Sequence, residues 1–122
     1  MKRILIFFFS FPFLTLAQGT IATYNIRYDG HTDLANDWSE RKEPIAQFVL
    51  DNQIKIIGFQ EVLHNQLLDL LQLLPNYTYV GVGRDDGKTQ GEYAPIFYDS
   101  TKFIAVQSGT FWLSSTPEKP SK

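Results

Sequence analysis

Apolar and polar residues alternate along several stretches of this chain, and the alternation predicts its strands. Residues 20–29, TIATYNIRYD, combine β-branched and aromatic residues with alternating polarity, so we expect a strand there. Residues 54–60, IKIIGFQ, are a continuous apolar run of the kind found in strands that are covered on both faces. Three further strands are expected at residues 77–83, 92–99 and 103–113.

Two other stretches have the periodicity of helices. In residues 39–53, SERKEPIAQFVLDNQ, apolar residues recur one turn apart after an acidic start. Pro44 should lie in the first turn of this helix, because a proline further inside would break it. Residues 64–75, HNQLLDLLQLLP, carry six leucines that give a wide apolar face, and Pro75 should end this second helix.

The predicted order β, α, β, α, β, β, β indicates a mixed sheet with both helices packed on one face. The strands of the second half also carry apolar residues at alternating positions, so the other face of the sheet should be apolar as well. Such a face needs a further layer, and the chain supplies none. We therefore expect one half of a layered domain, with no linker that divides the chain.

The N-terminus has the pattern of an export signal. Lys2 and Arg3 precede an apolar run that is short for a membrane span and ends in small residues. We expect a signal peptide over residues 1–17, cleaved after Ala17, and export to the periplasm or the outside of a bacterium. The alternative is an uncleaved membrane anchor, although the length of the run argues against a stable one.

Composition narrows the chemistry further. The 122 residues include no cysteine, which excludes disulfides and thiolate metal sites. The formal net charge is −2, so the surface as a whole offers no basic footprint for a polyanion. This charge disfavours nucleic acid as a partner without excluding it, because a local site binds phosphate with few charges.

Two oxygen-bearing side chains stand at expected strand ends. Glu61 follows the apolar run at residues 54–60, and Asn25 ends the apolar part of the first strand. Ligands of α/β sheets bind outside the carboxyl ends of the strands, and hard oxygen ligands suit Mg²⁺, Mn²⁺ or Ca²⁺ rather than zinc. The alternative is that Glu61 only caps the following helix, where the helix dipole favours a carboxylate, and that Asn25 is an ordinary strand-end residue.

Four motifs in order carry a family resemblance: TYNIRYD, IIGFQEV, GRDDGKTQGEYAPIFYD and SGTFWLS. With them the chain resembles the first part of the endonuclease/exonuclease/phosphatase superfamily, the DNase I-like group of metal-dependent phosphoesterases, and in particular its secreted bacterial branch. The resemblance implies an α+β (α/β) four-layer sandwich of two stacked mixed sheets with helices outside. Residues 18–122 would form the N-terminal half of that domain.

The resemblance also implies roles for individual residues. Glu61 would be the metal-binding glutamate, and Asn25 would contact the metal shell or the scissile phosphate. Many nucleases of the superfamily carry an acidic residue two places after this asparagine; here it is Arg27, which either faces a phosphate or points to solvent, and a strict two-metal scheme is therefore in doubt. Glu92 resembles the acid that orients a catalytic histidine, with a solvated strand-edge glutamate as the alternative, and Arg84 would line the substrate rim.

The other catalytic motifs of the superfamily are missing from these residues. A general-base histidine, an Asp-x-Asn set and a closing Asp-His pair belong to its second half, and neither His31 nor His64 matches them. We therefore expect a divalent-metal-dependent phosphoesterase, acting on a phosphodiester or phosphomonoester, that is inactive as these 122 residues alone and needs its C-terminal half as a partner. The alternatives are a glycosidase that uses Glu61 and a non-catalytic exported binding module.

Overall fold

The computed structural model describes residues 19–30 and 36–121. The predicted signal peptide at residues 1–17 and the residue His31 lie outside the described residues. Within the described part of the chain, no helix is both long and apolar enough to cross a bilayer.

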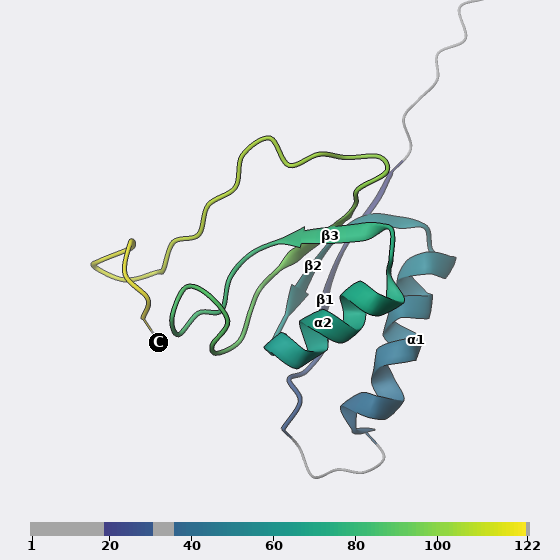
Figure 1. The fold of residues 1–122 in the computed structure, drawn as a ribbon, viewed down its shortest axis with the longest axis horizontal. Helices are drawn as coiled ribbons and strands as arrows, with labels where there is room; N and C mark the ends of the chain where they lie inside the picture. The colour runs from purple at the N-terminus through teal and green to yellow at the C-terminus, as the bar shows by residue number, and fades with distance from the viewer. Residues whose placement is uncertain (1–18, 31–35, 122) are drawn as a thin grey trace, which may run out of the picture.

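The described residues form one sheet and a layer of helices beside it (Figure 1). In chain order the elements are β1 (Thr20–Asn25), α1 (Trp38–Asp51), β2 (Ile54–Gln60), α2 (His64–Leu73), β3 (Tyr77–Val80) and β4 (Ile96–Asp99). Both helices and the first four strands of the predicted order are thus present, although most of the strands are shorter than the polarity pattern suggested.

The strands lie in the order β1-β2-β4-β3. β1 pairs with β2 in parallel, whereas β4 is antiparallel to both of its neighbours. The mixed sheet that the sequence predicts is therefore confirmed. Because β1 and β2 are parallel neighbours, their carboxyl ends lie at the same edge of the sheet.

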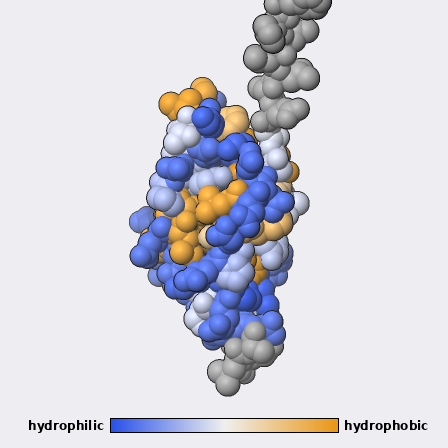
Figure 2. Space-filling view, turned by 90° about the vertical axis from the view of Figure 1, so that its right-hand side faces the viewer, coloured by the Kyte–Doolittle hydropathy of each residue, from blue (hydrophilic) through white to orange (hydrophobic). Residues whose placement is uncertain are grey.

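Helix α1 begins earlier than predicted. The side chain of Asp37 accepts a hydrogen bond from the backbone N–H of Ser39 and so caps the helix. With this start, Pro44 lies inside the helix and not in its first turn, so that part of the prediction is wrong. Phe48 and Leu50 of α1 are exposed. On the side of the molecule that carries α1, apolar surface shows between polar side chains (Figure 2).

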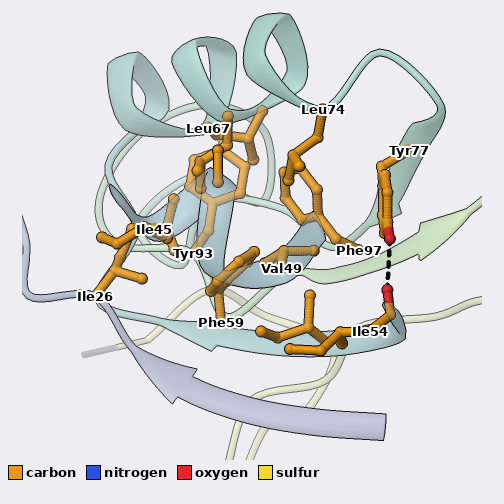
Figure 3. Close-up of a cluster of buried hydrophobic side chains, with 14 of the residues drawn as sticks. Ile26, Ile45, Val49, Ile54, Phe59, Leu67, Leu74, Tyr77, Tyr93 and Phe97 are labelled. Carbon is orange, nitrogen blue, oxygen red and sulfur yellow. Dashed lines mark hydrogen bonds between the residues drawn. The ribbon is translucent and has the colours of Figure 1, made fainter. Parts of the chain in front are cut away.

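The hydrophobic core lies between the helices and one face of the sheet (Figure 3). On that face Ile57 and Phe59 of β2 and Phe97 of β4 are completely buried, and the two phenylalanine rings meet edge to face at 5.4 Å. Burial of each such side chain stabilises the fold by roughly 1.5–3 kcal/mol. The core is completed by residues of both helices and the strand ends: Ile26, Ile45, Val49, Ile54, Leu67, Leu70, Leu74 and Tyr77.

The opposite face of the sheet is open. The register places Ile21 beside Ile56, and it places Ile56 beside Tyr98, all on this face. Ile21 is 73% exposed, and Ile96, which points the same way, is 47% exposed. β2 is therefore covered on one face and not on both as expected, because no helix or second sheet of the described residues packs on the other side.

The strand predicted at residues 103–113 is not formed. Ile104 is 85% and Val106 is 94% exposed, and the segment runs away from the sheet (Figure 1). A strand needs a partner for its backbone groups. Both edges of β4 are already paired, with β2 and β3, and the segment pairs with neither free edge of the sheet.

Candidate active site at the carboxyl ends of the parallel strands

The carboxyl ends of β1 and β2 bring Asn25 and Glu61 into contact. The amide Nδ2 of Asn25 donates a hydrogen bond of 2.8 Å to Oε1 of Glu61. The amide Oδ1 of Asn25 accepts one of 2.9 Å from the backbone N–H of Arg27, which fixes the orientation of the amide. The two residues that the sequence places at one sheet edge are therefore direct neighbours.

The backbone on both sides of this pair is unusual. Glu61 has φ +58° and Arg27 has φ +59°, so both occupy the left-handed region that residues other than glycine seldom adopt. Such a conformation costs on the order of 1–3 kcal/mol and persists only where its surroundings impose it. Two of the three described residues of this kind therefore lie at the Asn25–Glu61 pair, the third being Gln53 after α1.

Glu61 is not the residue that caps the N-terminus of α2. The N-cap residue is Leu63, whose backbone N–H donates to Oε1 of Gln66 at 2.9 Å. The hydrogen bond formed by the Glu61 carboxylate goes to Asn25. The alternative that Glu61 serves only as a helix cap is therefore not what the structure shows.

Glu92 and Arg84 form an ion pair at the neighbouring loop. Nη1 of Arg84 lies 3.2 Å from Oε2 of Glu92, and Nε of Arg84 lies 3.7 Å from Oδ1 of Asp85. Among the described residues, the partner of the Glu92 carboxylate is thus an arginine and not a histidine. Nδ1 of His64 is instead 3.0 Å from the hydroxyl of Tyr93, so the structure does not bring His64 to Glu92.

Hydrogen bonds between its own residues fix the loop that carries Arg84 and Glu92. Asp86 accepts hydrogen bonds from the backbone N–H groups of Lys88 and Gln90, and chiefly the latter holds the pKa of its carboxyl below the ordinary value. Gly91 has φ +77°, and a Cβ atom at this position would lie only 2.5 Å from Cγ of Asp85 and collide with it. The loop therefore presents its two charged residues from a defined backbone.

Glu61, Arg84 and Glu92 line one hollow of about 540 Å³. Its other walls include the aromatic residues Phe111 and Trp112, and the indole N–H of Trp112 donates to the backbone carbonyl of Arg84 at 2.8 Å. The side chain of Arg27 does not line this hollow. Of the predicted site residues, the structure thus gathers three around one cavity and adds Asn25 through its bond to Glu61.

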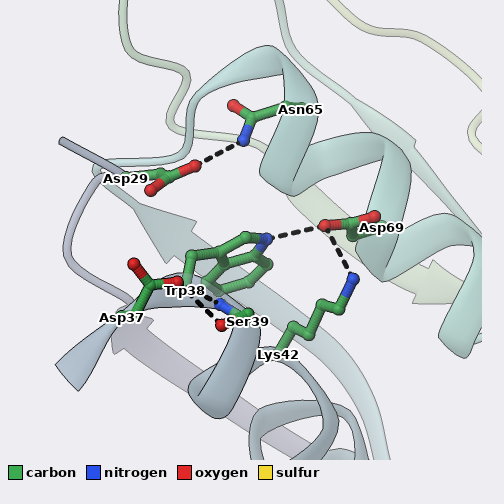
Figure 4. A network of polar contacts seen from close by, with 7 residues as sticks. All are labelled: Asp29, Asp37, Trp38, Ser39, Lys42, Asn65 and Asp69. Carbon is green, nitrogen blue, oxygen red and sulfur yellow. Dashed lines mark hydrogen bonds and ion pairs between the residues drawn. The ribbon is translucent and has the colours of Figure 1, made fainter. Parts of the chain in front are cut away.

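Polar side chains connect α1 to α2 through a hydrogen bond and an ion pair (Figure 4). The indole N–H of Trp38 donates to Oδ2 of Asp69 at 2.7 Å, and Nζ of Lys42 lies 3.4 Å from the same oxygen. Nδ2 of Asn65 donates to Oδ2 of Asp29 at 2.7 Å, which joins α2 to the segment after β1. The helices are thus fixed to the backbone that follows Asn25.

The donor atoms at the sheet edge fit a hard cation better than a soft one. Within the described residues no three acidic or histidine side chains cluster as a complete metal cage. Oε1 of Glu61 accepts from Asn25, and Oε2 has no protein partner among the described residues. One carboxylate oxygen with a neighbouring amide oxygen suits Mg²⁺, which keeps several waters and takes few protein ligands.

Solved structures similar to this chain are known from Bacteroides species. An endonuclease/exonuclease/phosphatase from Bacteroides vulgatus is 52% identical over 80% of this chain, with a TM-score of 0.78. A family protein from Bacteroides thetaiotaomicron is 47% identical over 85% of this chain, and a mannosyl-6-phosphatase from the same organism is 46% identical over 85%, each with a TM-score of 0.82. No protein-family model and no curated protein matches the chain significantly.

The similarity covers only part of each of these structures, namely 38%, 39% and 40% of their chains. This chain therefore spans well under half of their length. The sheet with its two helices corresponds to the N-terminal part of the DNase I-like fold, as the resemblance implied. By sequence and by fold, the chain belongs to the endonuclease/exonuclease/phosphatase family, whose members of this kind are phosphoesterase-type hydrolases.

Proposed function

We propose that the chain carries the metal-binding part of the active site of a divalent-metal-dependent phosphoesterase. The observation that supports it most directly is the Glu61 carboxylate, held on a left-handed backbone at the end of a packed strand and bonded by Asn25 through only one of its oxygens. A rigid carboxylate at a strand end positions a ligand more precisely than a carboxylate on a loop. The expected cation is Mg²⁺, with Mn²⁺ or Ca²⁺ as substitutes.

Each residue of the site has a distinct part in this proposal. Glu61 would hold the cation with the carboxylate oxygen that Asn25 does not bond, and the amide oxygen of Asn25 would be available to the cation or its water. Arg84 binds a phosphate oxygen of the substrate, and Glu92 holds its guanidinium in place. The cation, when bound, supplies polarisation of a phosphoryl oxygen and neutralises developing charge.

The hollow beside these residues supports a small phosphate ester as substrate rather than a long nucleic acid. Its walls combine three charged residues with aromatic surface, and the three charges are two carboxylates and one guanidinium. The single guanidinium offers a partner to one phosphate, whereas a polyanion requires a row of basic residues that this lining lacks. Because one similar structure is a mannosyl-6-phosphatase, mannose 6-phosphate is the first compound to test.

The open face of the sheet supports the proposal that the site is completed by further chain. Ile21 and Ile96 are exposed there, and the similar structures are more than twice as long as this chain. We propose that the C-terminal half of the domain packs on this face and supplies the general base. Without a positioned base, hydrolysis is slower by about 10²–10⁴-fold, so these 122 residues alone should be inactive. Export by residues 1–17 is part of the same proposal.

The first experiment measures cation binding, because it does not require turnover. Mn²⁺ is titrated into the chain while the free ion is followed by electron paramagnetic resonance. Glu61→Gln should weaken Mn²⁺ affinity at least tenfold, since it removes the charged ligand. Glu43→Gln is the matched control, because Glu43 is an exposed residue of α1 and the substitution changes the net charge equally.

Two results would contradict the proposal. Equal Mn²⁺ affinity in the wild type and in Glu61→Gln would show that Glu61 holds no cation. Hydrolysis of mannose 6-phosphate or of an activated phosphodiester by the purified chain, lost on Glu61→Ala, would show that the chain is active alone. Chelator-insensitive cleavage of a glycoside would instead favour the glycosidase alternative.

A further inference from the structure

Gln66 is a completely buried polar side chain next to the proposed site, with 0% of its surface exposed. It lies on the apolar face of α2, between leucines. Its Oε1 accepts from the backbone N–H groups of Leu63 at 2.9 Å and of Asp29 at 3.1 Å, and its Nε2 donates to the carbonyl of Arg27 at 3.1 Å. One amide thus joins the segment after β1 to the segment after β2.

Both segments are those that hold the Asn25–Glu61 pair. The carbonyl of Arg27 is held by Gln66, the N–H of Arg27 is bonded to Oδ1 of Asn25, and Nδ2 of Asn25 is bonded to Glu61. On the other side, Leu63 lies two residues after Glu61. Gln66 is therefore linked to the pair from two directions.

Arg41 of α1 supports the same backbone. Its guanidinium donates to the carbonyl of Ile26 and, at 3.3 and 3.4 Å, to the carbonyl of Arg27. It also lies over the ring of Trp38 at 5.5 Å, which limits its freedom. The left-handed conformation of Arg27 is thus imposed by one side chain from each helix.

We propose that Gln66, assisted by Arg41, is a positioning residue of the cation site. It imposes the conformation of Arg27, which sets the amide of Asn25 and through it the direction of the Glu61 carboxylate. The proposal rests on the proposed cation-binding function. It assigns to a buried glutamine a role that is distinct from stabilising the fold.

The test compares Gln66→Met with Tyr77→Phe. Methionine keeps the length and the apolar contacts of Gln66 but forms none of its three hydrogen bonds. Tyr77→Phe removes a buried hydrogen bond to the carbonyl of Ile54, at the other end of β2 from Glu61. We expect both variants to melt at lower temperature, whereas only Gln66→Met should weaken Mn²⁺ affinity, by about tenfold. Arg41→Lys, which keeps the charge but loses the forked donor, should weaken it less and also serves if Gln66→Met fails to fold.

A second readout does not depend on the cation. In nitrogen-15 correlation spectra without metal, the side-chain amide signals of Asn25 should move toward those of a solvent-exposed asparagine in Gln66→Met and Arg41→Lys, and stay in place in Tyr77→Phe. Unchanged Asn25 signals and unchanged Mn²⁺ affinity in both site variants would overturn the proposal. If the wild type itself binds no Mn²⁺, the proposed function fails, and the Asn25 signals alone decide whether Gln66 positions this amide.

Discussion

The two faces of the sheet are built from the same strands but stand in opposite environments. Phe97 and Ile96 are neighbours on β4, yet Phe97 is completely buried beneath the helices and Ile96 is 47% exposed on the open face. The helical face is packed as a protein interior, whereas the open face is an apolar surface with no cover among the described residues. Among the described residues, the chain therefore completes only one of the two packed faces that a layered fold requires.

Stability should change most when Phe97 and Ile96, adjacent residues of β4 on opposite faces of the sheet, are each replaced by alanine. Phe97→Ala should lower the free energy of unfolding by about 3–5 kcal/mol, because it leaves a cavity beside Phe59. Ile96→Ala should lower it by about 1 kcal/mol or less, since half of that side chain already contacts water. Urea denaturation of both variants checks the comparison, and Phe97→Leu gives an intermediate point if Phe97→Ala does not fold. Equal losses would show that the open face is covered in solution.

The elements with strong local signals could be predicted from the sequence. The apolar run of β2 and the leucine periodicity of α2 gave bounds that the structure repeats closely. The segment at residues 103–113 shows the limit of such reasoning, because strand-favouring residues cannot reveal whether a partner strand exists. Pro44 shows another limit, since the capping oxygen of Asp37 decides where α1 begins.

The contact between Asn25 and Glu61 could be predicted, because both residues stand at the carboxyl ends of strands that are parallel neighbours. The role of Gln66 could not, because a single glutamine in a leucine-rich helix gives no local signal and its three partners come from distant segments. A polar residue on the apolar face of a helix is the one feature that could have drawn attention to it. The pairing of Glu92 with Arg84 depends likewise on how their loop folds back.

A smaller effect concerns the one acidic side chain buried at the end of β4. Asp99 accepts a hydrogen bond of 2.6 Å from the hydroxyl of Thr101 and lies 3.4 Å from Nζ of Lys55, and these contacts hold its pKa below the ordinary value of 3.8. A carboxyl whose pKa is lower in the folded chain contributes stability above pH 3.8, and this contribution is lost as the pH falls through the folded value. In Asp99→Asn the decline of stability below pH 4 should be shallower than in the wild type.

Thermal unfolding from pH 2.5 to pH 7 measures this difference. The decline should not vanish, because the pKa values of Asp37 and Asp86 are also lowered by hydrogen bonds and act in the same direction. Glu43→Gln, an exposed substitution on α1, is the control for the change in net charge. An acid profile of Asp99→Asn that runs parallel to the wild type would contradict the assignment.

The smallest effect on stability, but the most direct test of the open face, comes from making that face polar. Ile21→Thr with Ile96→Thr keeps two strand-favouring residues and removes exposed apolar area, so the free energy of unfolding should change by about 1 kcal/mol or less. Self-association should nevertheless decrease, because uncovered apolar sheet surface promotes contact between copies. Sedimentation velocity over a range of protein concentrations measures it. Leu68→Gln is the matched control, as Leu68 is 52% exposed on α2, in the helical layer. If the control reduces association as much as the double variant, general surface hydrophobicity is the cause; if only the double variant does, the open face is the surface that requires a partner.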